Sequence, residues 1–596
     1  MSTELENKTI SINNQEYKIN IPEEFDITDT HITKYDDNII SSLLWVDSEI
    51  FFPDTGNHSS TIVGIDSRSN LFKITVPNQA IFSTNRNHLF NSLLNKGAAI
   101  KPKNQKDISE YLCDQQASNQ IIGLSKLGWN NSINGEKIFV LPNKIYSNPN
   151  DDTVYKYLPD KETQSQLSVY QSGSLDEWKT NIATSCKGNP LITFAMGASF
   201  SSALLYLLNL DGGGFHFYGH SSRGKTTLLQ LSASIWGNSI DPAVGGKDAY
   251  IGRWSITPNA IELIGTAYSD ICLINDELGT NTDNTFSETI YNLTAGVGKV
   301  RLTEDSKQTW RTSLLSSGEL KISDQIAKAS GKEALAGQKV RVLDIHVEDI
   351  FLNTNDLPAK EFVENIKQNC CHYFGSAGEC FIEHLLEIAN DSEKLNDLRS
   401  RFSELSASLA QDNMQPEQSR ALNRFAIVNL ALDLSIDLGL LPITQNEAHE
   451  SVKTTLVTWI EDFSTISDID IGINNIIDYI RSNPRRFVNC EESENTTSNI
   501  MGYIKNNHYI ISIKNLREIT NYSNVNEIAK KLNSLGFLHL NNSSTNGNKR
   551  LTSTHRIKDA GTVSGYAISA NILDYLGQDT EIEEVENNVS NIALEQ

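Results

Sequence analysis

The residues best suited to chemistry lie in the segment 215–236, which reads FHFYGHSSRGKTTLLQLSASIW. This pattern predicts a short strand, a glycine-containing loop and a helix in succession. Glycines let such a loop fold tightly, so that backbone N–H groups face phosphate oxygens at the positive end of the helix. Lys225 is predicted to reach the β- and γ-phosphates of ATP, and the Thr226 hydroxyl to ligate Mg²⁺. The predicted nucleotide-binding residues are Gly219, His220, Ser221, Ser222, Arg223, Gly224, Lys225, Thr226 and Thr227.

A second acidic motif lies about fifty residues downstream, where residues 271–277 read ICLINDE. An apolar run that ends in carboxylates is typical of a buried parallel strand whose end faces a ligand crevice. Asp276 is predicted to hold the Mg²⁺ shell, and Glu277 to orient and deprotonate the attacking water. Acidic residues often end strands, so the motif alone is weak. Its place after the loop favours ATP hydrolysis over a fold that only binds nucleotide.

Composition limits the classes of partner. The chain has 596 residues, enough for three or four domains, and seven cysteines without a secretory leader favour a reducing cytoplasm. Its formal net charge of −24 opposes nucleic-acid binding unless lysine and arginine gather locally. Residues 191–208 are uncharged and about long enough to span a membrane. Their glycine and serine content, and their place just before the motif strand, favour a buried helix, so we expect no membrane contact.

The order of predicted elements divides the chain into parts. Strands at 61–65, 71–76 and 137–141 alternate with helices near 88–94 and 108–112, which predicts a small α+β domain. Further on, helices alternate with buried strands at 312–316 and 340–345, which predicts a three-layer αβα sandwich. Two short helices within 515–540 followed by a hairpin around the turn 541–548 predict a winged helix. The predicted parts are a flexible lead-in (1–35), an N-terminal α+β domain (36–160), the sandwich (165–350), a helical lid (351–460), the winged helix (465–577) and an acidic tail (578–596).

Several segments together resemble a known family. The order FHFYGHSSRGKTT, GRWSITPNAIELIGTAYSDICLINDELG, IYNLTAGVGKVRL, WRTSLLSSGE and AGQKVRVLDI is similar to an uncharacterised-domain family of ATPases found in prophages, plasmids and staphylococcal cassettes. Its better-studied members resemble minichromosome-maintenance (MCM) helicases of the P-loop AAA+ class. The resemblance implies an α/β ATPase that forms a ring, expected to be hexameric, and that serves as a DNA helicase in replication of a mobile element.

The resemblance also implies roles for single residues. Lys299, Arg301 and Lys307 fall where MCM-like proteins place a hairpin that grips DNA in the central channel; ordinary solubilising charges are the alternative. Arg341 falls at the position of the arginine finger that completes a neighbouring subunit's site, although a strand-end arginine paired with a local acid would look the same. Arg424 is a candidate second sensor, with Arg420 as its rival one helical turn away. Ser317 stands where the family usually carries a sensor asparagine.

The C-terminal region concentrates positive charge in an acidic chain. On a winged helix, Lys530, Lys531, Lys549 and Arg550 are predicted to contact duplex or forked DNA, together with Arg481, Arg485, Arg486, Arg556 and Lys558. A winged helix that contacts protein is an open alternative.

Two further possibilities are weighed against this interpretation. Cys370, Cys371, His372, Cys380 and His384 could form a zinc set, but their spacing favours small thiols in a helical core. The preferred function is an ATP- and Mg²⁺-dependent DNA helicase. The alternatives are a nucleotide-switched regulator or antiphage-defence ATPase that does not unwind DNA, and a membrane-tethered ATPase.

Overall fold

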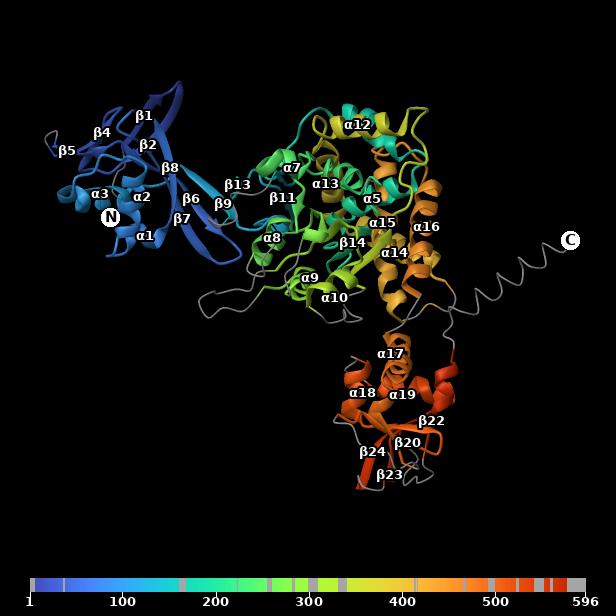
Figure 1. The fold of residues 1–596 in the computed structure, drawn as a ribbon. Helices are drawn as coiled ribbons and strands as arrows, with labels where there is room; N and C mark the ends of the chain where they lie inside the picture. Colours follow the sequence, from blue (N-terminus) through green and yellow to red (C-terminus); the bar gives the residue numbers. More distant parts are fainter. Residues whose placement is uncertain are drawn as a thin grey trace. The chain divides into compact units, whose positions relative to one another are not determined.

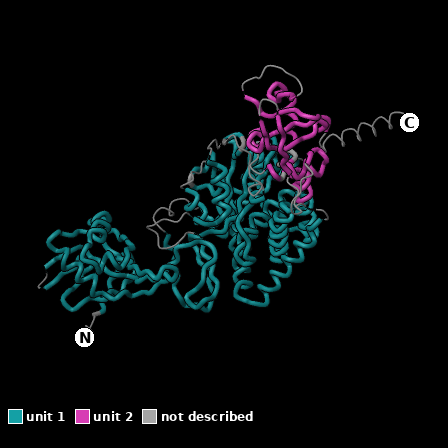
Figure 2. The backbone as a smooth tube through the Cα atoms, turned by 90° about the horizontal axis from the view of Figure 1, so that it is seen from below, with its two compact units in different colours: residues 1–329, 337–455 teal, residues 330–336, 456–596 magenta. Residues whose placement is uncertain are grey.

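The computed structural model describes residues 6–575 apart from 36–37, 160–167, 222, 255–259, 281–284, 299–308, 331–339, 412–413, 415, 465–467, 491–498, 521–524, 541–550 and 558–560. The chain divides into two compact units, drawn in teal and magenta in Figure 2. The larger unit comprises residues 1–329 and 337–455, and the smaller one comprises 330–336 and 456–596. Each unit has a hydrophobic core of its own.

The N-terminal part of the larger unit is mainly β-structure (Figure 1). It holds a five-stranded sheet in the order β13-β9-β6-β7-β8, a three-stranded sheet β3-β4-β5 and a two-stranded sheet β1-β2. The elements are β1 (Glu6–Ile12), β2 (Gln15–Ile21), β3 (Phe25–Ile27), β4 (His31–Lys34), β5 (Asn38–Ser42), β6 (Leu44–Phe52), β7 (Asn57–Ile65), β8 (Leu71–Pro77), α1 (Asn78–Phe82), α2 (Asn87–Asn95), η1 (Pro102–Asn104), α3 (Gln105–Asp114), β9 (Asn119–Leu124) and β13 (Tyr155–Tyr157).

Residues 6–35 differ from the flexible lead-in that the sequence predicts. β2 alternates exposed and buried residues, and its Tyr17, Ile19 and Ile21 belong to the same core as Trp45. The rings of Tyr17 and Trp45 meet edge to face, with centroids 5.1 Å apart. The polar composition was misleading because a strand with one buried face exposes every second residue. The N-terminal domain therefore includes these strands.

A small sheet links this part to the helical region that follows. It is formed by β10 (Gly128–Asn131), β11 (Lys137–Val140) and β12 (Ile145–Tyr146). The Trp129 indole N–H donates to the carbonyl of Ala203 at 2.8 Å, and Lys144 Nζ lies 2.8 Å from a carboxylate oxygen of Glu379. The sheet is thus fixed to the helices by buried and ionic contacts.

The centre of the larger unit is a five-stranded parallel sheet in the order β15-β16-β17-β14-β18. Its strands are β14 (Gly213–Tyr218), β15 (Gly252–Arg253), β16 (Cys272–Asp276), β17 (Ser313–Gly318) and β18 (Val342–His346). All residues of β16 and β17 are buried, as expected for strands covered on both faces. The strands predicted near 312–316 and 340–345 are therefore present.

Helices pack on this sheet. α5 and α6 both contact β17, and α5 also contacts α15. The apolar segment 191–208 forms α5 and a following 3₁₀ turn, nearly all of it buried, as the sequence predicts. The helices around the sheet are α4 (Leu175–Asn181), η3 (Ala183–Cys186), α5 (Pro190–Phe200), η4 (Ser201–Leu204), α6 (Lys225–Ala233), α7 (Pro242–Gly245), η5 (Gly246–Asp248), α8 (Ile261–Ala267), η6 (Leu278–Thr280), α9 (Phe286–Ala295) and α10 (Ile322–Ser330).

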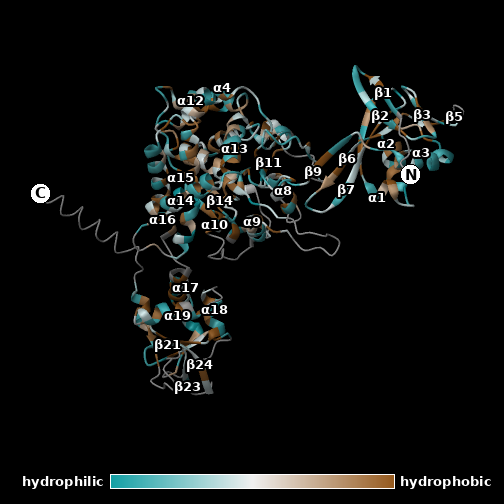
Figure 3. Cartoon of the chain, turned by 180° about the vertical axis from the view of Figure 1, so that it is seen from behind, coloured by the Kyte–Doolittle hydropathy of each residue, from teal (hydrophilic) through white to brown (hydrophobic). Residues whose placement is uncertain are grey.

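The following stretch is helical, in agreement with the prediction. The buried helix α15 brings Phe425 against Phe215 of β14, with ring centroids 5.4 Å apart. In α14 hydrophilic and hydrophobic residues are mixed along the helix, as Figure 3 shows. These helices are α12 (Ala359–Cys370), α13 (Ser376–Ala389), α14 (Ser392–Leu409), α15 (Pro416–Asp437) and α16 (Gln445–Ser464).

The smaller unit contains the two helices predicted within 515–540, as α18 and α19. Its hairpin differs from the prediction: β22 and β23 flank the segment 541–550, but both pair with β24. The sequence also gave no sign of the strands β19–β21, which are short and half exposed. The elements are α17 (Asp468–Ser482), η7 (Pro484–Arg486), β19 (Phe487–Asn489), β20 (Gly502–Lys505), β21 (His508–Ile511), α18 (Ile513–Thr520), α19 (Val525–Ser534), β22 (Leu538–His539), β23 (Ser553–Ile557), β24 (Gly561–Ser569) and η8 (Ala570–Asp574).

Candidate nucleotide-binding site

The glycine loop (residues 219–226) connects the end of β14 to the start of α6. Gly219 and Gly224 have φ angles of 143° and 93°, values that glycine adopts without strain. A Cβ atom on Gly219 would lie 2.7 Å from the carbonyl oxygen of Val347, and one on Gly224 would lie 2.5 Å from the Phe351 ring. Both glycines are thus required by backbone conformation and by close packing.

Lys225 is the first residue of α6, and its side chain returns over the loop. Its Nζ donates to the carbonyl oxygens of Gly219 and His220, each at 2.7 Å. Burial lowers the pKa of Lys225, while the negative charges of Glu319, Glu277 and Asp276, in that order, act in the opposite direction. The ammonium group therefore lies near three acidic side chains at the mouth of the loop.

The two predicted motifs meet at the carboxyl ends of the strands. Thr226 Oγ1 donates to Asp276 Oδ2 at 3.0 Å, and Ser317 Oγ donates to Asp276 Oδ1. This meeting is possible because β17 lies between β16 and β14 in the sheet. A hydroxyl and a carboxylate supply the oxygen ligands that Mg²⁺ prefers, so the residues fit the predicted cation.

Glu277 follows β16 in a left-handed conformation, with φ of 60°. Its backbone N–H donates to Asp276 Oδ1 at 2.9 Å and lies 3.4 Å from Ser317 Oγ. A left-handed non-glycine residue costs conformational energy, and such strain concentrates at functional sites. The turn places the exposed Glu277 side chain just beyond the residues that fit the cation.

A buried polar chain holds the neighbouring end of β17. Trp254 Nε1 donates to Ser316 Oγ at 2.7 Å, while His216 Nδ1 lies 2.8 Å from the same hydroxyl and His216 Nε2 lies 2.9 Å from the Leu320 carbonyl. All partners are satisfied if Nε2 carries the proton and Nδ1 accepts from Ser316. Burial lowers the pKa of His216 to about 4, so the ring is neutral near pH 7.

The remaining predicted loop residues have different placements. His220 and Ser221 are exposed at the mouth of the loop, and Arg223 NH1 lies 3.5 Å from Asp349. Thr227 is buried inside α6. Ser222 lies outside the described residues.

One acidic residue at this site was missed by sequence reasoning. Glu319 Oε1 accepts a hydrogen bond from Ser221 Oγ at 2.9 Å, directly on the glycine loop. No spacing rule points to Glu319. Its place just after a strand that was expected to carry a sensor residue was the one available signal.

Comparison with known proteins gives a family match over part of the chain and a shared fold. Residues 17–312 match the family described as Domain of unknown function (DUF927). The solved structure titled "SCCmec type IV Cch - active helicase" has the same fold, with a TM-score of 0.66 and 19% identity over 93% of this chain and 99% of that chain. A solved structure of the NrS-1 C-terminal region, at 11% identity over 64% of this chain and 86% of that chain, has a TM-score of only 0.23. No curated protein matches the chain.

The DUF927 match bears out in part the resemblance found in the sequence. It begins within β2, covers the glycine loop and the acidic motif, and ends at Thr312 just before β17. It stops before Ser317, Arg341 and Arg424. Their roles are therefore open to testing.

Arg341 and Arg424 lie at the amino ends of the parallel strands, whereas the glycine loop lies at their carboxyl ends. Arg341 immediately precedes β18, and its guanidinium lies over the Tyr291 ring at 4.3 Å. Arg424 Nε donates to the Val340 carbonyl at 3.2 Å. Burial lowers the pKa of Arg424 to about 10, the charge of Arg341 adds to this effect, and Asp211 opposes it. The two arginines are thus neighbours, remote from their own chain's glycine loop.

The predicted hairpin residues Lys299, Arg301 and Lys307 lie outside the described residues. The residues on either side of that segment are described. Val297 and Thr309 form an antiparallel bridge, and the Trp310 N–H donates to the Gly296 carbonyl at 3.0 Å. The two ends of the segment are therefore held together.

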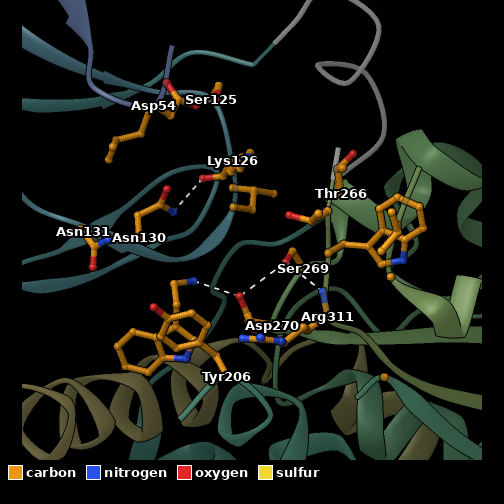
Figure 4. Close-up of a pocket in the computed structure, with 18 of the residues that line it drawn as sticks. Asp54, Ser125, Lys126, Asn130, Asn131, Tyr206, Thr266, Ser269, Asp270 and Arg311 are labelled. Carbon is orange, nitrogen blue, oxygen red and sulfur yellow. Dashed lines mark hydrogen bonds between the residues drawn. The ribbon is translucent and has the colours of Figure 1, made fainter. Parts of the chain in front are cut away.

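A cavity of about 600 Å³ adjoins this bridge (Figure 4). Asp270 lies on its wall, and Oδ2 of this residue accepts from the Trp129 N–H at 3.0 Å, while Oδ1 has no hydrogen-bond partner among the described residues. Burial raises the pKa of Asp270 to about 7; the Trp129 hydrogen bond and the Arg311 charge counteract part of this effect. Asp270 therefore ties β10 to the start of β16 at an energetic cost.

The predicted DNA-binding residues of the smaller unit are divided. Lys530 and Lys531 lie on α19, the first exposed and the second half-buried, whereas Lys549 and Arg550 lie outside the described residues. Arg481 donates to the Leu573 carbonyl, and Arg486 donates to the Tyr479 hydroxyl. These two arginines therefore hold the fold of the unit together.

Two alternatives find no support in the described part of the chain. No cluster of three or more histidine, cysteine or acidic side chains suited to a metal ion is found there, and Cys370 is fully buried on α12. None of the helices in the same residues is both long enough and apolar enough to cross a bilayer.

Proposed function

We propose that this protein is an ATP-dependent DNA helicase or translocase of the MCM-like AAA+ type, acting in replication of a mobile genetic element. The observation that carries the proposal is the contact of Thr226 with Asp276 at 3.0 Å, beside the Lys225 ammonium. Two motifs fifty residues apart thereby form one site with groups for phosphate, cation and water.

Each side chain has a distinct part in the proposed hydrolysis. Lys225 and the loop N–H groups bind the phosphates, and Thr226 and Asp276 would hold Mg²⁺. A Mg²⁺ ion held by these residues would supply positive charge to offset the negative charge that develops on the phosphates. Glu277 orients the attacking water and takes its proton, and Ser317 fixes Asp276 through its hydroxyl.

The arginine pair supports a site shared between subunits. Arg341 and Arg424 cannot serve their own chain's glycine loop, because the loop follows β14 while Arg341 precedes the parallel strand β18. A second copy could receive the Arg341 guanidinium at its γ-phosphate, where a planar and permanently charged group is suited to the task. A closed ring, expected to be a hexamer, satisfies every such interface.

The DNA-binding role rests on the hairpin segment and the smaller unit. Lys299, Arg301 and Lys307 would grip the strand in the ring's channel, and α19 would contact DNA through Lys530 and Lys531. The fold shared with a structure titled an active helicase supports this assignment.

Strand displacement on a forked DNA substrate tests the proposal. We expect the wild-type protein to separate the strands with ATP and Mg²⁺. The Glu277→Gln variant should bind ATP but hydrolyse it about 10²–10⁴ times more slowly, since it lacks the general base. If the wild-type protein hydrolyses ATP and binds DNA without separating strands, the helicase assignment is wrong.

One observation favours a second candidate. Arg481 and Arg486 are engaged within the smaller unit, which reduces the positive charge available for DNA in a chain of net charge −24. A nucleotide-switched regulator or defence ATPase that binds nucleic acid or protein would need no unwinding. It would show hydrolysis on the same fork without strand displacement.

A further inference from the structure

Glu319 leaves the parallel sheet beside the glycine loop. β17 pairs with β14 so that Gly318 lies opposite Tyr218, and the next residue of each strand enters the site. The carboxylate of Glu319 accepts from Ser221 Oγ at 2.9 Å. It is therefore in direct contact with the loop that would hold the triphosphate.

The negative charge of the same carboxylate also acts on Lys225. Among the three acids whose charges favour the ammonium form of Lys225, Glu319 has the largest effect, ahead of Glu277 and Asp276. The latter two have other tasks at the cation and the water. Glu319 thus adds negative charge near the lysine that would bind the β- and γ-phosphates.

The backbone that carries Glu319 is held on both sides. His216 contacts the Ser316 hydroxyl before it and the Leu320 carbonyl after it. A Cβ on Gly318 would lie 3.0 Å from both the His216 ring and Leu278, so this segment is tightly packed. The position of Glu319 beside the loop is therefore set by buried groups, although its side chain is exposed.

We propose that Glu319 is a positioning residue that sets nucleotide affinity, because its carboxylate engages the Ser221 hydroxyl and places a negative charge on the loop that would hold the γ-phosphate. This inference rests on the proposed ATP site. A γ-phosphate that approaches Lys225 meets the like charge of Glu319 and competes for the Ser221 hydroxyl. ADP lacks the γ-phosphate and meets less of this repulsion. Glu319 thereby weakens ATP binding selectively and returns to the loop when the phosphate leaves.

Equilibrium binding to the full chain tests this proposal. The probes are a non-hydrolysable ATP analogue and ADP, each with Mg²⁺. We expect Glu319→Gln to bind the analogue about five to ten times more tightly, the effect of removing one like charge near a solvent-exposed site. ADP affinity should change by less than about twofold. Glu319→Asp keeps the charge but shortens the reach to Ser221. Its affinity for the analogue should lie between those of the wild type and Glu319→Gln.

The matched control is Glu348→Gln. Glu348 is an exposed carboxylate on the segment after β18, where it pairs with His346 at 3.8 Å. The substitution removes one negative charge from the same carboxyl ends of the strands. It should leave the affinities for the analogue and for ADP within about twofold of the wild-type values. Thermal melting of each variant verifies that it is folded.

Three results would overturn the proposal: unchanged or weaker analogue binding in both Glu319 variants, equal tightening of analogue and ADP, or a loss of kcat as large as that of Glu277→Gln. The last would mark Glu319 as the general base. If the wild-type chain binds neither probe, the proposed ATP site itself fails, which is a distinct outcome.

Discussion

At the scale of the residue, the neighbouring hydroxyls of Ser316 and Ser317 have different partners. Ser317 donates to Asp276, which would hold the cation, whereas Ser316 joins Trp254 to His216 inside the sheet. The sequence SSGE carries two adjacent serines, and no local pattern tells them apart. Only the register of β17 against β14 and β16 separates the hydroxyl that contacts Asp276 from the one held inside the sheet.

We therefore predict that the two alanine variants affect different properties, one the rate of ATP turnover and the other thermal stability. Ser317→Ala loses one hydrogen bond to a charged group, worth about 1.5–3 kcal/mol, and should lower kcat about 10- to 100-fold with little change in thermal stability. Ser316→Ala removes the hydrogen bonds that the Trp254 indole N–H and His216 Nδ1 make with this buried hydroxyl, and should lower the melting temperature. ATP turnover and thermal unfolding measured on both variants check this. Equal effects on turnover would contradict the assignment of Ser317.

At the scale of the element, the parallel strands and the glycine loop were predictable because apolar runs ending in special residues have few alternatives. The strands of residues 6–34 were not, because one exposed face makes them look like a polar leader. The arginines illustrate a different limit. Arg341 was identified through the family resemblance, but that Arg424 lies beside it depends on how α15 packs against β14, which no local pattern encodes.

Asp270 gives a prediction for the junction between β10 and the central sheet. Its folded-state pKa of about 7 lies above the ordinary value of 3.8, so the folded protein binds this proton more tightly than the unfolded chain. Ionisation of Asp270 therefore costs stability as pH rises from about 4 to 7, by up to about 4 kcal/mol.

The Asp270→Asn variant should thus gain stability relative to wild type as pH rises through this window. Urea unfolding of both proteins between pH 4.5 and 8 measures the difference. Asp54→Asn, which replaces an exposed carboxylate on the same cavity, is the control and should show no such trend. A difference that does not depend on pH would show that Asp270 is ionised at no cost.

The segment between Val297 and Thr309 carries the prediction about DNA. Lys299→Ala combined with Arg301→Ala should abolish stimulation of ATP hydrolysis by single-stranded DNA and leave basal hydrolysis largely intact. The reason is that these cations would bind backbone phosphates and not nucleotide. The measurement is the ATPase rate with and without DNA at two salt concentrations. A loss of basal hydrolysis would contradict the hairpin role.

At the scale of the whole molecule, one chain carries the two halves of its proposed site at opposite ends of the parallel strands. Lys225, Thr226, Asp276 and Glu277 follow the strands or end them, whereas Arg341 precedes one. Neither half can reach the other within a protomer, so the proposed shared site requires copies of the chain to alternate around a closed assembly. Hydrolysis at each junction could then be coupled to movement of the hairpins along DNA.

Mixing two inactive variants tests this central claim most directly. Lys225→Ala protomers lack the phosphate-binding lysine and Arg341→Ala protomers lack the arginine, so each alone should be nearly inactive. An equal mixture should recover ATP hydrolysis, up to about a quarter of the wild-type rate, because random assembly places an intact loop beside an intact arginine at that fraction of junctions. If the mixture stays as inactive as its components, or if Arg341→Ala alone retains full turnover, the shared site does not exist.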